Sequence, residues 1–296
     1  MMNDKDFPNL YIIGTAKAAT TSLANYLKGH PDIFLSEMKE PHFWAEGFPT
    51  PRLGILRCVK EISKYRALYA GGVGCKYRVD ASTSYLCSKN APIGIGKVSG
   101  VKIIVILRDP VDRYISHYRN DFSDSVEKRS LMEVIADELK TEVSSYSFFD
   151  YGLYAKHLKR WLESLDSQSI MCVDFDELAN SSEATLSRLY DFIGLADYLN
   201  VGLPQNNSAY VPTNRVTAFL MRMGMLRSVV RALMPAILRK YLRANILFKR
   251  GKSVIAQVTE CRVRLRIAYA PEMSELRTLL KKVPSVGSFS FIDKYE

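Results

Sequence analysis

The sequence predicts an α/β protein of the P-loop type, a three-layer fold in which helices flank a mostly parallel central sheet. Two apolar runs are each followed by a turn and a helix-forming segment, within residues 10–28 and 101–118. A third apolar run, at residues 169–175, continues this alternation. Strands that alternate with helices form a parallel sheet, because each crossover helix returns the chain to the end of the sheet at which the previous strand began. A basic helical appendage is expected at the C-terminus.

The first two units can be read residue by residue. Residues 10–13 form a short apolar strand, and residues 20–28 carry apolar side chains spaced to lie on one side of a helix. Residues 101–107 are all apolar except Lys102, whereas a strand with one solvent-exposed face would alternate apolar and polar residues. This pattern indicates a central parallel strand that is covered on both faces. Asp109 and Pro110 then favour a helix start, because Asp caps free N–H groups and Pro tolerates the first helical position.

Further elements follow in the same order. Ser130 and Glu133 have the spacing of a capping box and predict a helix from that point. Residues 151–165 predict another helix, and the strand at 169–175 comes next. Ser181 is then expected to cap a helix that ends at Gly194.

The positive charge of the chain is concentrated in one segment. The 296 residues carry a net charge of +10, and 47% of them are hydrophobic, enough for a substantial core. No Asp or Glu occurs from Tyr198 to Thr259, whereas ten Lys and Arg lie between residues 215 and 252. Any polyanionic partner therefore concerns this segment. We expect a core at residues 1–214 and a helical basic region at 215–296, packed on the core or extending from it.

Residues 226–242 have an apolar helical spacing with basic residues between, and Pro235 must kink or restart that helix. Segregated apolar and basic positions are typical of helices that lie on anionic membranes. Peripheral membrane contact through residues 215–252 is therefore one hypothesis, and a helix packed on the core with its charges in water is the other.

Cysteine usage and the apolar runs bear on location. The five cysteines are odd in number and form no CxxC pair or metal-type spacing, so reduced thiols and no metal site are expected. No secretory signal is visible near the N-terminus. Basic residues interrupt the apolar runs well before the roughly 18 residues that cross a bilayer. We expect a cytoplasmic protein.

The loop after the first strand has the length of a P-loop but departs from it. In residues 14–21, Ala19 stands at the second glycine, Thr20 stands at the usual lysine, and Lys17 comes earlier. A nucleoside triphosphate site is therefore disfavoured. A tight turn that opens a helix still attracts an anion through its free N–H groups and the helix dipole. The candidate residues are Lys17, Ala18, Ala19, Thr20, Thr21 and Ser22, and the alternative is a strand-to-helix turn with no ligand.

A second candidate anion site follows the central strand. Arg108 lies at its carboxyl end, the edge where open α/β sheets bind ligands, and Ser116 lies about two helical turns further on. The alternative for Arg108 is an ion pair with Asp109 or Asp112. A triphosphatase would place a magnesium-binding aspartate directly after this strand, where the chain has arginine. The two segments together indicate a site for two anions without a metal.

Several ordered motifs resemble one known family, the carbohydrate sulfotransferases that use the donor PAPS (3′-phosphoadenosine 5′-phosphosulfate), including heparan sulfate sulfotransferases and their bacterial relatives. The resemblance extends over roughly the first two thirds of the chain. The motifs that carry it are Tyr11 to Leu23, His30-Pro31, Lys39-Glu40-Pro41-His42-Phe43-Trp44, Asp80 to Leu86, Leu107 to Tyr118 and Gly152 to Trp161.

The resemblance implies a role for each motif. The first loop, Lys17 to Ser22, would bind the 5′ phosphosulfate of PAPS, and Arg108 with Ser116 would bind its 3′ phosphate. Glu40 would be the general base and Lys17 would stabilise the leaving phosphate. His42 would orient the acceptor or the base, with packing beside Phe43 and Trp44 as its alternative. The implied reaction moves a sulfuryl group to a hydroxyl of a glycan or glycolipid and releases PAP; no nucleic acid partner is expected.

The chain also departs from the family. Ala18 and Ala19 replace glycines that are common in its phosphate loop, which reduces the freedom of the backbone. Ala81 stands where the heparan branch carries a lysine, so a heparan-like acceptor is not supported. Two other functions stay open: a P-loop kinase of a small metabolite, which would consume ATP with magnesium, and a non-catalytic module that binds membranes or polyanions through residues 215–252.

Overall fold

The computed structural model describes residues 7–45, 58–123, 126–140, 142–198 and 252–296. In this part of the chain six strands form one sheet in the order β2-β3-β1-β4-β5-β6, and every neighbouring pair is parallel. The strands are β1 Leu10–Gly14, β2 Ile33–Leu35, β3 Tyr77–Asp80, β4 Lys102–Leu107, β5 Ile170–Asp174 and β6 Ser285–Val286.

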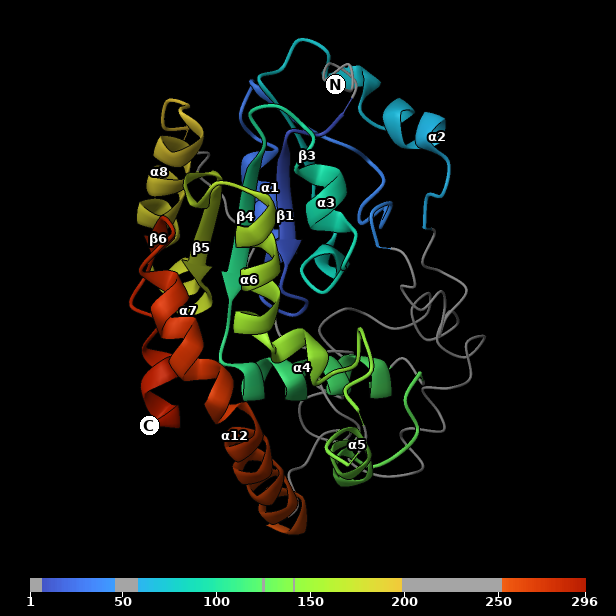
Figure 1. Ribbon diagram of the computed structural model, residues 1–296, viewed down its shortest axis with the longest axis vertical. Helices are drawn as coiled ribbons and strands as arrows, with labels where there is room; N and C mark the ends of the chain where they lie inside the picture. The colour runs from blue at the N-terminus through green and yellow to red at the C-terminus, as the bar shows by residue number, and fades with distance from the viewer. Residues whose placement is uncertain (1–6, 46–57, 124–125, 141, 199–251) are drawn as a thin grey trace, which may run out of the picture.

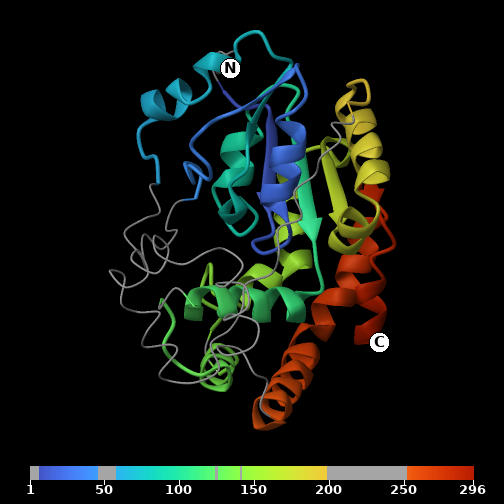
Figure 2. The ribbon, with the colours of Figure 1, turned by 180° about the vertical axis from the view of Figure 1, so that it is seen from behind.

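Helices cover both faces of this sheet (Figures 1 and 2). Side chains of α3, α6 and α12 pack on one face and those of α1, α7 and α8 on the other, each set enclosing its own apolar core. The described helices are α1 Thr20–Leu27, α2 Ile62–Ala67, α3 Ala91–Ile95, α4 Pro110–Ser123, α5 Leu131–Glu138, α6 Tyr154–Ser164, α7 Phe175–Asn180, α8 Ser182–Ile193 and α12 Lys252–Leu280.

Strand β1 shows how the sequence pattern makes the layers. Tyr11 and Ile13 point into the core beneath α3 and α6, whereas Leu10 and Ile12 point into the core beneath α1 and α8. All four are fully buried, because successive side chains of a strand alternate between two covered faces. The predicted three-layer α/β fold with a parallel sheet is therefore confirmed.

The helix ends test the expected caps. Asp109 caps α4 by accepting the Val111 N–H at 2.9 Å. The capping box of Ser130 and Glu133 is present at the start of α5. Ser181 occupies the N-cap of α8, but its hydroxyl makes no cap hydrogen bond there. Gly194 ends α8 with φ of 63°, the left-handed conformation that glycine adopts without steric cost.

The described C-terminal residues, 252–296, pack onto the same sheet and helices. Strand β6 extends the sheet through the pair Val173 and Val286, and α12 packs against α6. The boundary expected at residue 214 and the basic helix expected at 226–242 lie outside the described residues. None of the described helices is both long and apolar enough to cross a membrane.

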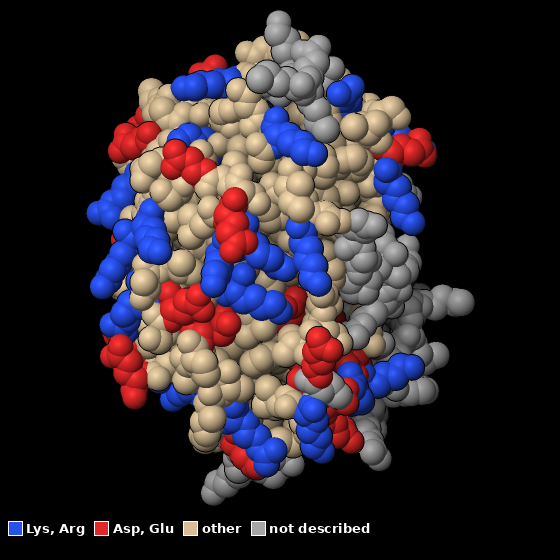
Figure 3. Space-filling model, in the orientation of Figure 1, with Lys and Arg blue, Asp and Glu red and all other residues tan. Residues whose placement is uncertain are grey.

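Charge is mixed on the face shown in Figure 3, where Lys and Arg side chains lie close to Asp and Glu. Lys159 of α6 lies 3.9 Å from Glu275 of α12, and Arg277 lies 2.6 Å from Asp293. This mixture agrees with the sequence, in which the excess positive charge falls between Tyr198 and Thr259.

Candidate active site

The loop between β1 and α1 is fixed to its neighbours by hydrogen bonds. The Thr15 N–H donates to the Ile106 carbonyl of β4 at 2.9 Å, and the Thr15 hydroxyl donates to the Tyr151 carbonyl at 3.2 Å. Lys17 and Ala19 have φ of 71° and 60°, a left-handed backbone that bends the chain sharply into α1. The first helical bond runs from Leu23 N–H to Ala19 carbonyl, so the N–H groups of residues 20–22 point out of the helix start.

Helix α4 lies against this loop at the carboxyl ends of β1 and β4 (Figure 1). The Lys17 ammonium donates to Asn120 Oδ1 at 3.0 Å, and Arg108 Nη1 donates to the Lys17 carbonyl at 2.9 Å. Ser116 lies one turn before Asn120 on the same face of α4. The structure therefore brings both predicted anion-binding segments together around Lys17.

Arg108 is held in place by groups other than carboxylates. Its guanidinium lies 4.5 Å from the ring centre of Phe175, and its carbonyl accepts the Tyr154 hydroxyl at 2.8 Å. Burial lowers the pKa of Arg108, yet an arginine stays protonated in proteins. A positive charge is thus positioned beside the loop.

The two carboxylates that might have paired with Arg108 make other contacts. Asp109 caps α4 and accepts the Tyr295 hydroxyl at 3.0 Å. Asp112 forms an ion pair of 2.6 Å with Arg262. The alternative of a simple local ion pair for Arg108 is therefore disfavoured.

The segment that carries Glu40 lies beside the start of α1. Glu40 and His42 have φ of 51° and 52°, again left-handed. Glu40 Oε2 accepts the Thr83 hydroxyl at 3.2 Å, and its side chain is 23% exposed. Burial raises the pKa of Glu40, while Lys39 and the Thr83 hydrogen bond oppose this rise. A partly buried carboxylate with a raised pKa has the properties of a general base.

His42 lies between Glu40 and a buried hydroxyl. Its Nε2 is 3.4 Å from Glu40 Oε2, and its Nδ1 is 2.7 Å from Ser84 Oγ. Its backbone N–H donates to Ser82 Oγ at 3.2 Å. Burial lowers the pKa of His42 to about 4, so the ring is neutral at pH 7. The ring faces the Glu40 carboxylate, as an orienting group would.

Lys39 joins the two halves of the site. Its ammonium donates to the Thr21 hydroxyl of α1 and lies 3.7 Å from Glu40 Oε1. No sequence pattern predicted a role for Lys39, Asn120, Thr83 or Ser84. Lys39 directly precedes Glu40, and Asn120 follows Ser116 by one helical turn. Their closeness to these predicted site residues is the sequence signal that could have indicated either of them.

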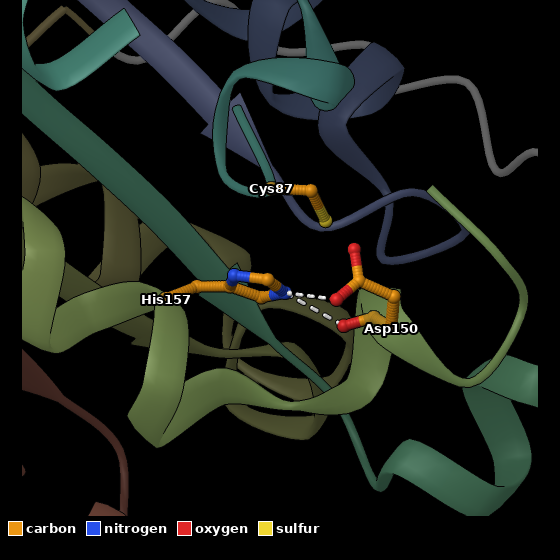
Figure 4. Close-up of side chains that lie close together, drawn as sticks. All are labelled: Cys87, Asp150 and His157. Carbon is orange, nitrogen blue, oxygen red and sulfur yellow. Dashed lines mark hydrogen bonds and ion pairs between the residues drawn. The ribbon is translucent and has the colours of Figure 1, made fainter. Parts of the chain in front are cut away.

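Cys87, Asp150 and His157 form a buried cluster (Figure 4), and Cys87 packs against Ala16 of the loop between β1 and α1. His157 Nε2–H donates to the Asp150 carbonyl at 2.7 Å, and Arg160 donates to His157 Nδ1 at 2.5 Å. Lys156 lies 3.0 Å from Asp150 Oδ1. Both ring nitrogens are thus engaged and two cations border the cluster, an arrangement that disfavours a further metal cation. We interpret the cluster as a support for the loop.

Comparisons with known proteins agree with this arrangement. Residues 89–201 match the family model described as sulfotransferase domain. Human heparan sulfate glucosamine 3-O-sulfotransferase 3B1 is 30% identical over 197 residues, which cover 64% of this chain and 47% of that protein. Human carbohydrate sulfotransferase 15 is 24% identical over 249 residues, covering 64% and 44%. The chain thus spans about half the length of the curated relatives it matches.

A solved structure shares the fold. The crystal structure of a sulfotransferase from Alicyclobacillus acidocaldarius aligns with a TM-score of 0.66 at 23% identity, over 93% of this chain and 96% of that one. Residues 89–201 are thus similar to a sulfotransferase domain, about two thirds of the chain is similar to heparan sulfate sulfotransferases, and the fold is that of a solved sulfotransferase.

Proposed function

We propose that this protein transfers a sulfuryl group from PAPS to a hydroxyl of a carbohydrate acceptor and releases PAP. One observation carries the proposal: Lys17 and Arg108 meet in one site, which Lys39 links to the partly buried carboxylate of Glu40. Two cationic positions suit a donor with phosphate groups at both its 5′ and 3′ ends. A carboxylate beside them suits the removal of a proton from the acceptor.

The loop and α4 divide the binding of the donor. The outward N–H groups and hydroxyls of residues 20–22, with the Lys17 ammonium, would hold the 5′ phosphosulfate. Arg108 and Ser116 would hold the 3′ phosphate. The residues fit such a ligand, because the hydrogen bonds and the aromatic contact of Arg108 fix the cation before binding. The donor supplies the sulfuryl group and a phosphate leaving group.

Three side chains carry the chemistry that the chain itself performs. Glu40 accepts the proton of the acceptor hydroxyl, and its raised pKa strengthens it as a base. His42 faces Glu40 Oε2 and holds the carboxylate in one orientation. Lys17 neutralises the charge that develops on the leaving phosphate, which requires its ammonium to exchange Asn120 for the donor.

The names of the relatives support a glycan as acceptor, since several are heparan sulfate sulfotransferases. Ala81, buried in the core beneath α1, leaves no cation where the heparan branch carries a lysine. We therefore propose a carbohydrate other than heparan sulfate, free or linked to lipid. The membrane hypothesis for residues 215–252 concerns residues outside those described and stays a prediction, as does a cytoplasmic location.

Transfer of labelled sulfate tests the proposal. The protein is incubated with ³⁵S-labelled PAPS and a panel of glycans, glycolipids and small alcohols. Glu40→Gln keeps the shape of the side chain but removes the base, so transfer should fall by about 100-fold or more while PAP binding persists. Glu61→Gln is the matched control, because Glu61 is an exposed carboxylate paired with Lys64.

Three outcomes would each contradict one part of the proposed function: the base, the acceptor or the type of reaction. Transfer at the wild-type rate by Glu40→Gln would remove Glu40 from the base role. Binding of PAP without transfer to any glycan would remove the carbohydrate acceptor. Consumption of ATP with magnesium would favour the kinase alternative.

A further inference from the structure

A run of three hydroxyl residues, Ser82 to Ser84, lines the segment that carries Glu40. Each hydroxyl makes a different contact: Ser82 accepts the His42 N–H, Thr83 donates to Glu40, and Ser84 meets the His42 ring. We infer that Ser84 is a positioning residue that fixes the tautomer of His42, so that the ring N–H is directed at Glu40. This inference rests on the proposed role of Glu40 as the base.

The geometry at the ring leaves one consistent arrangement. A neutral imidazole has one N–H donor and one bare nitrogen. The ionised Glu40 carboxylate can only accept, and it faces Nε2 at 3.4 Å, so the proton belongs on Nε2. Nδ1 is then the bare nitrogen, and the Ser84 hydroxyl at 2.7 Å must donate to it. The opposite tautomer would set the Nε2 lone pair against a negative charge.

Ser84 can fix the ring because its own position is fixed. It is fully buried in the short 3-10 turn Thr83–Tyr85. The preceding Asp80, 1% exposed, accepts the hydroxyls of Tyr65 at 2.6 Å, Ser82 at 2.6 Å and Tyr85 at 2.9 Å. Ser82 directly precedes the turn and Tyr85 is its last residue, so these hydrogen bonds tie both ends of the turn to the buried Asp80.

The ring in turn supports Glu40. The left-handed backbone at Glu40 and His42 is costly for residues with a Cβ and persists only where neighbours hold it. The bond from His42 N–H to Ser82 holds the backbone, and the ring contact with Ser84 holds the side chain. Loss of the Ser84 hydroxyl would remove the donor that Nδ1 has at 2.7 Å and weaken the hold on a ring that faces Glu40.

Nitrogen NMR of the histidines tests this inference without donor or acceptor. In protein labelled with ¹⁵N-histidine at pH 7, His42 should show a protonated Nε2 and a bare, hydrogen-bonded Nδ1. Ser84→Ala should shift the Nδ1 resonance and broaden the ring signals, and Ser84→Thr, which keeps a hydroxyl, should restore them. The matched control is Ser88→Ala, which removes a buried hydroxyl that bonds to the Trp44 carbonyl instead. It should leave the His42 resonances in place.

Kinetics supply the second readout. Ser84→Ala should lower kcat about tenfold with little change in KM, the rate equivalent of one lost hydrogen bond, and Ser84→Thr should recover most of it. A proton on Nδ1 in the wild type, or His42 resonances that Ser84→Ala does not move, would overturn the inference. Since the NMR result needs no sulfate transfer, it separates an error about Ser84 from an error about the reaction.

Discussion

Four candidate site residues share an unusual backbone. Lys17, Ala19, Glu40 and His42 are non-glycine residues with φ between 51° and 71°. Such conformations cost on the order of 1–3 kcal/mol each and persist where the surroundings impose them. Hydrogen bonds from Thr15 N–H to β4 and from His42 N–H to Ser82 supply part of that constraint. The site is therefore shaped before a ligand binds.

The pH dependence of transfer should follow the carboxylate of Glu40. A base must be ionised, and burial raises the pKa of Glu40, so kcat/KM should fall on the acid side at a higher pH than for an exposed glutamate. The charged or titratable groups that face it are Lys39, His42, Asp80 and Tyr151. Of these, the Lys39 cation lowers its pKa.

Lys39→Ala should therefore move the acid limb of the kcat/KM profile to higher pH, because the pKa of Glu40 loses the effect that holds it down. Lys64→Ala is the control, since Lys64 pairs with the exposed Glu61. An acid limb that stays in place or moves to lower pH in Lys39→Ala would contradict the electrostatic role given to Lys39.

The loop between β1 and α1 carries two adjacent alanines that differ in conformation. Ala19 has φ of 60°, whereas Ala18 has an ordinary negative φ and a fully buried methyl group. Ala19→Gly should raise the free energy of unfolding by up to about 1 kcal/mol, because glycine adopts the left-handed backbone without strain. Ala18→Gly should lower it by about 1 kcal/mol through the lost methyl and the added chain entropy.

Denaturant unfolding of both variants measures these changes. Opposite signs are expected from two chemically identical substitutions at neighbouring positions. Destabilisation by both would show that the conformation of Ala19 is not strained, and the alanines would then need no special explanation.

The strands differ in how well the sequence predicts them. β1, β4 and β5 were predicted because each is a continuous apolar run covered on both faces. β3 was missed, since it has four residues and two of them, Arg78 and Asp80, are charged. The charges are tolerated because Arg78 donates to the Phe7 carbonyl and Asp80 accepts three hydroxyls. Phe7 lies 71 residues from Arg78, and the three hydroxyls of Asp80 come from Ser82, Tyr85 and Tyr65, a set with no periodic spacing, so no sequence pattern indicates these partners.

At the scale of the whole molecule, the C-terminal region adds a strand to the sheet that no sequence pattern predicted. β6 has two residues, too few for a periodic signal, yet it pairs with β5. The Phe289 N–H that follows donates to Asp174 at 2.7 Å, and Phe291 is buried in the core with α6 and α12. The described C-terminal residues therefore stabilise the same sheet that carries the site.

The sheet topology could be used to predict which of the candidate site residues lie near one another. Arg108, Lys17 and Ser116 come from separate motifs, and a parallel sheet brings the carboxyl ends of β1 and β4 to one edge. The contacts through Lys39, Asn120 and Ser84 were not predictable, because they depend on how side chains meet across segments far apart in sequence. Topology thus predicts which candidate segments meet, whereas the contacts between their side chains follow from packing.

Calorimetry of nucleotide binding tests the two-anion site most directly. PAP carries 3′ and 5′ phosphates, whereas adenosine 5′-phosphate lacks the 3′ group, so PAP should bind at least about tenfold more tightly. Arg108→Ala should weaken PAP binding by about tenfold to 100-fold and reduce that preference, as Ser116→Ala should to a smaller degree. Lys159→Ala, a surface cation of α6, is the control. Equal affinity for the two nucleotides, or PAP binding that Arg108→Ala leaves unchanged, would contradict the claim that Arg108 binds the 3′ phosphate in a site for two anions.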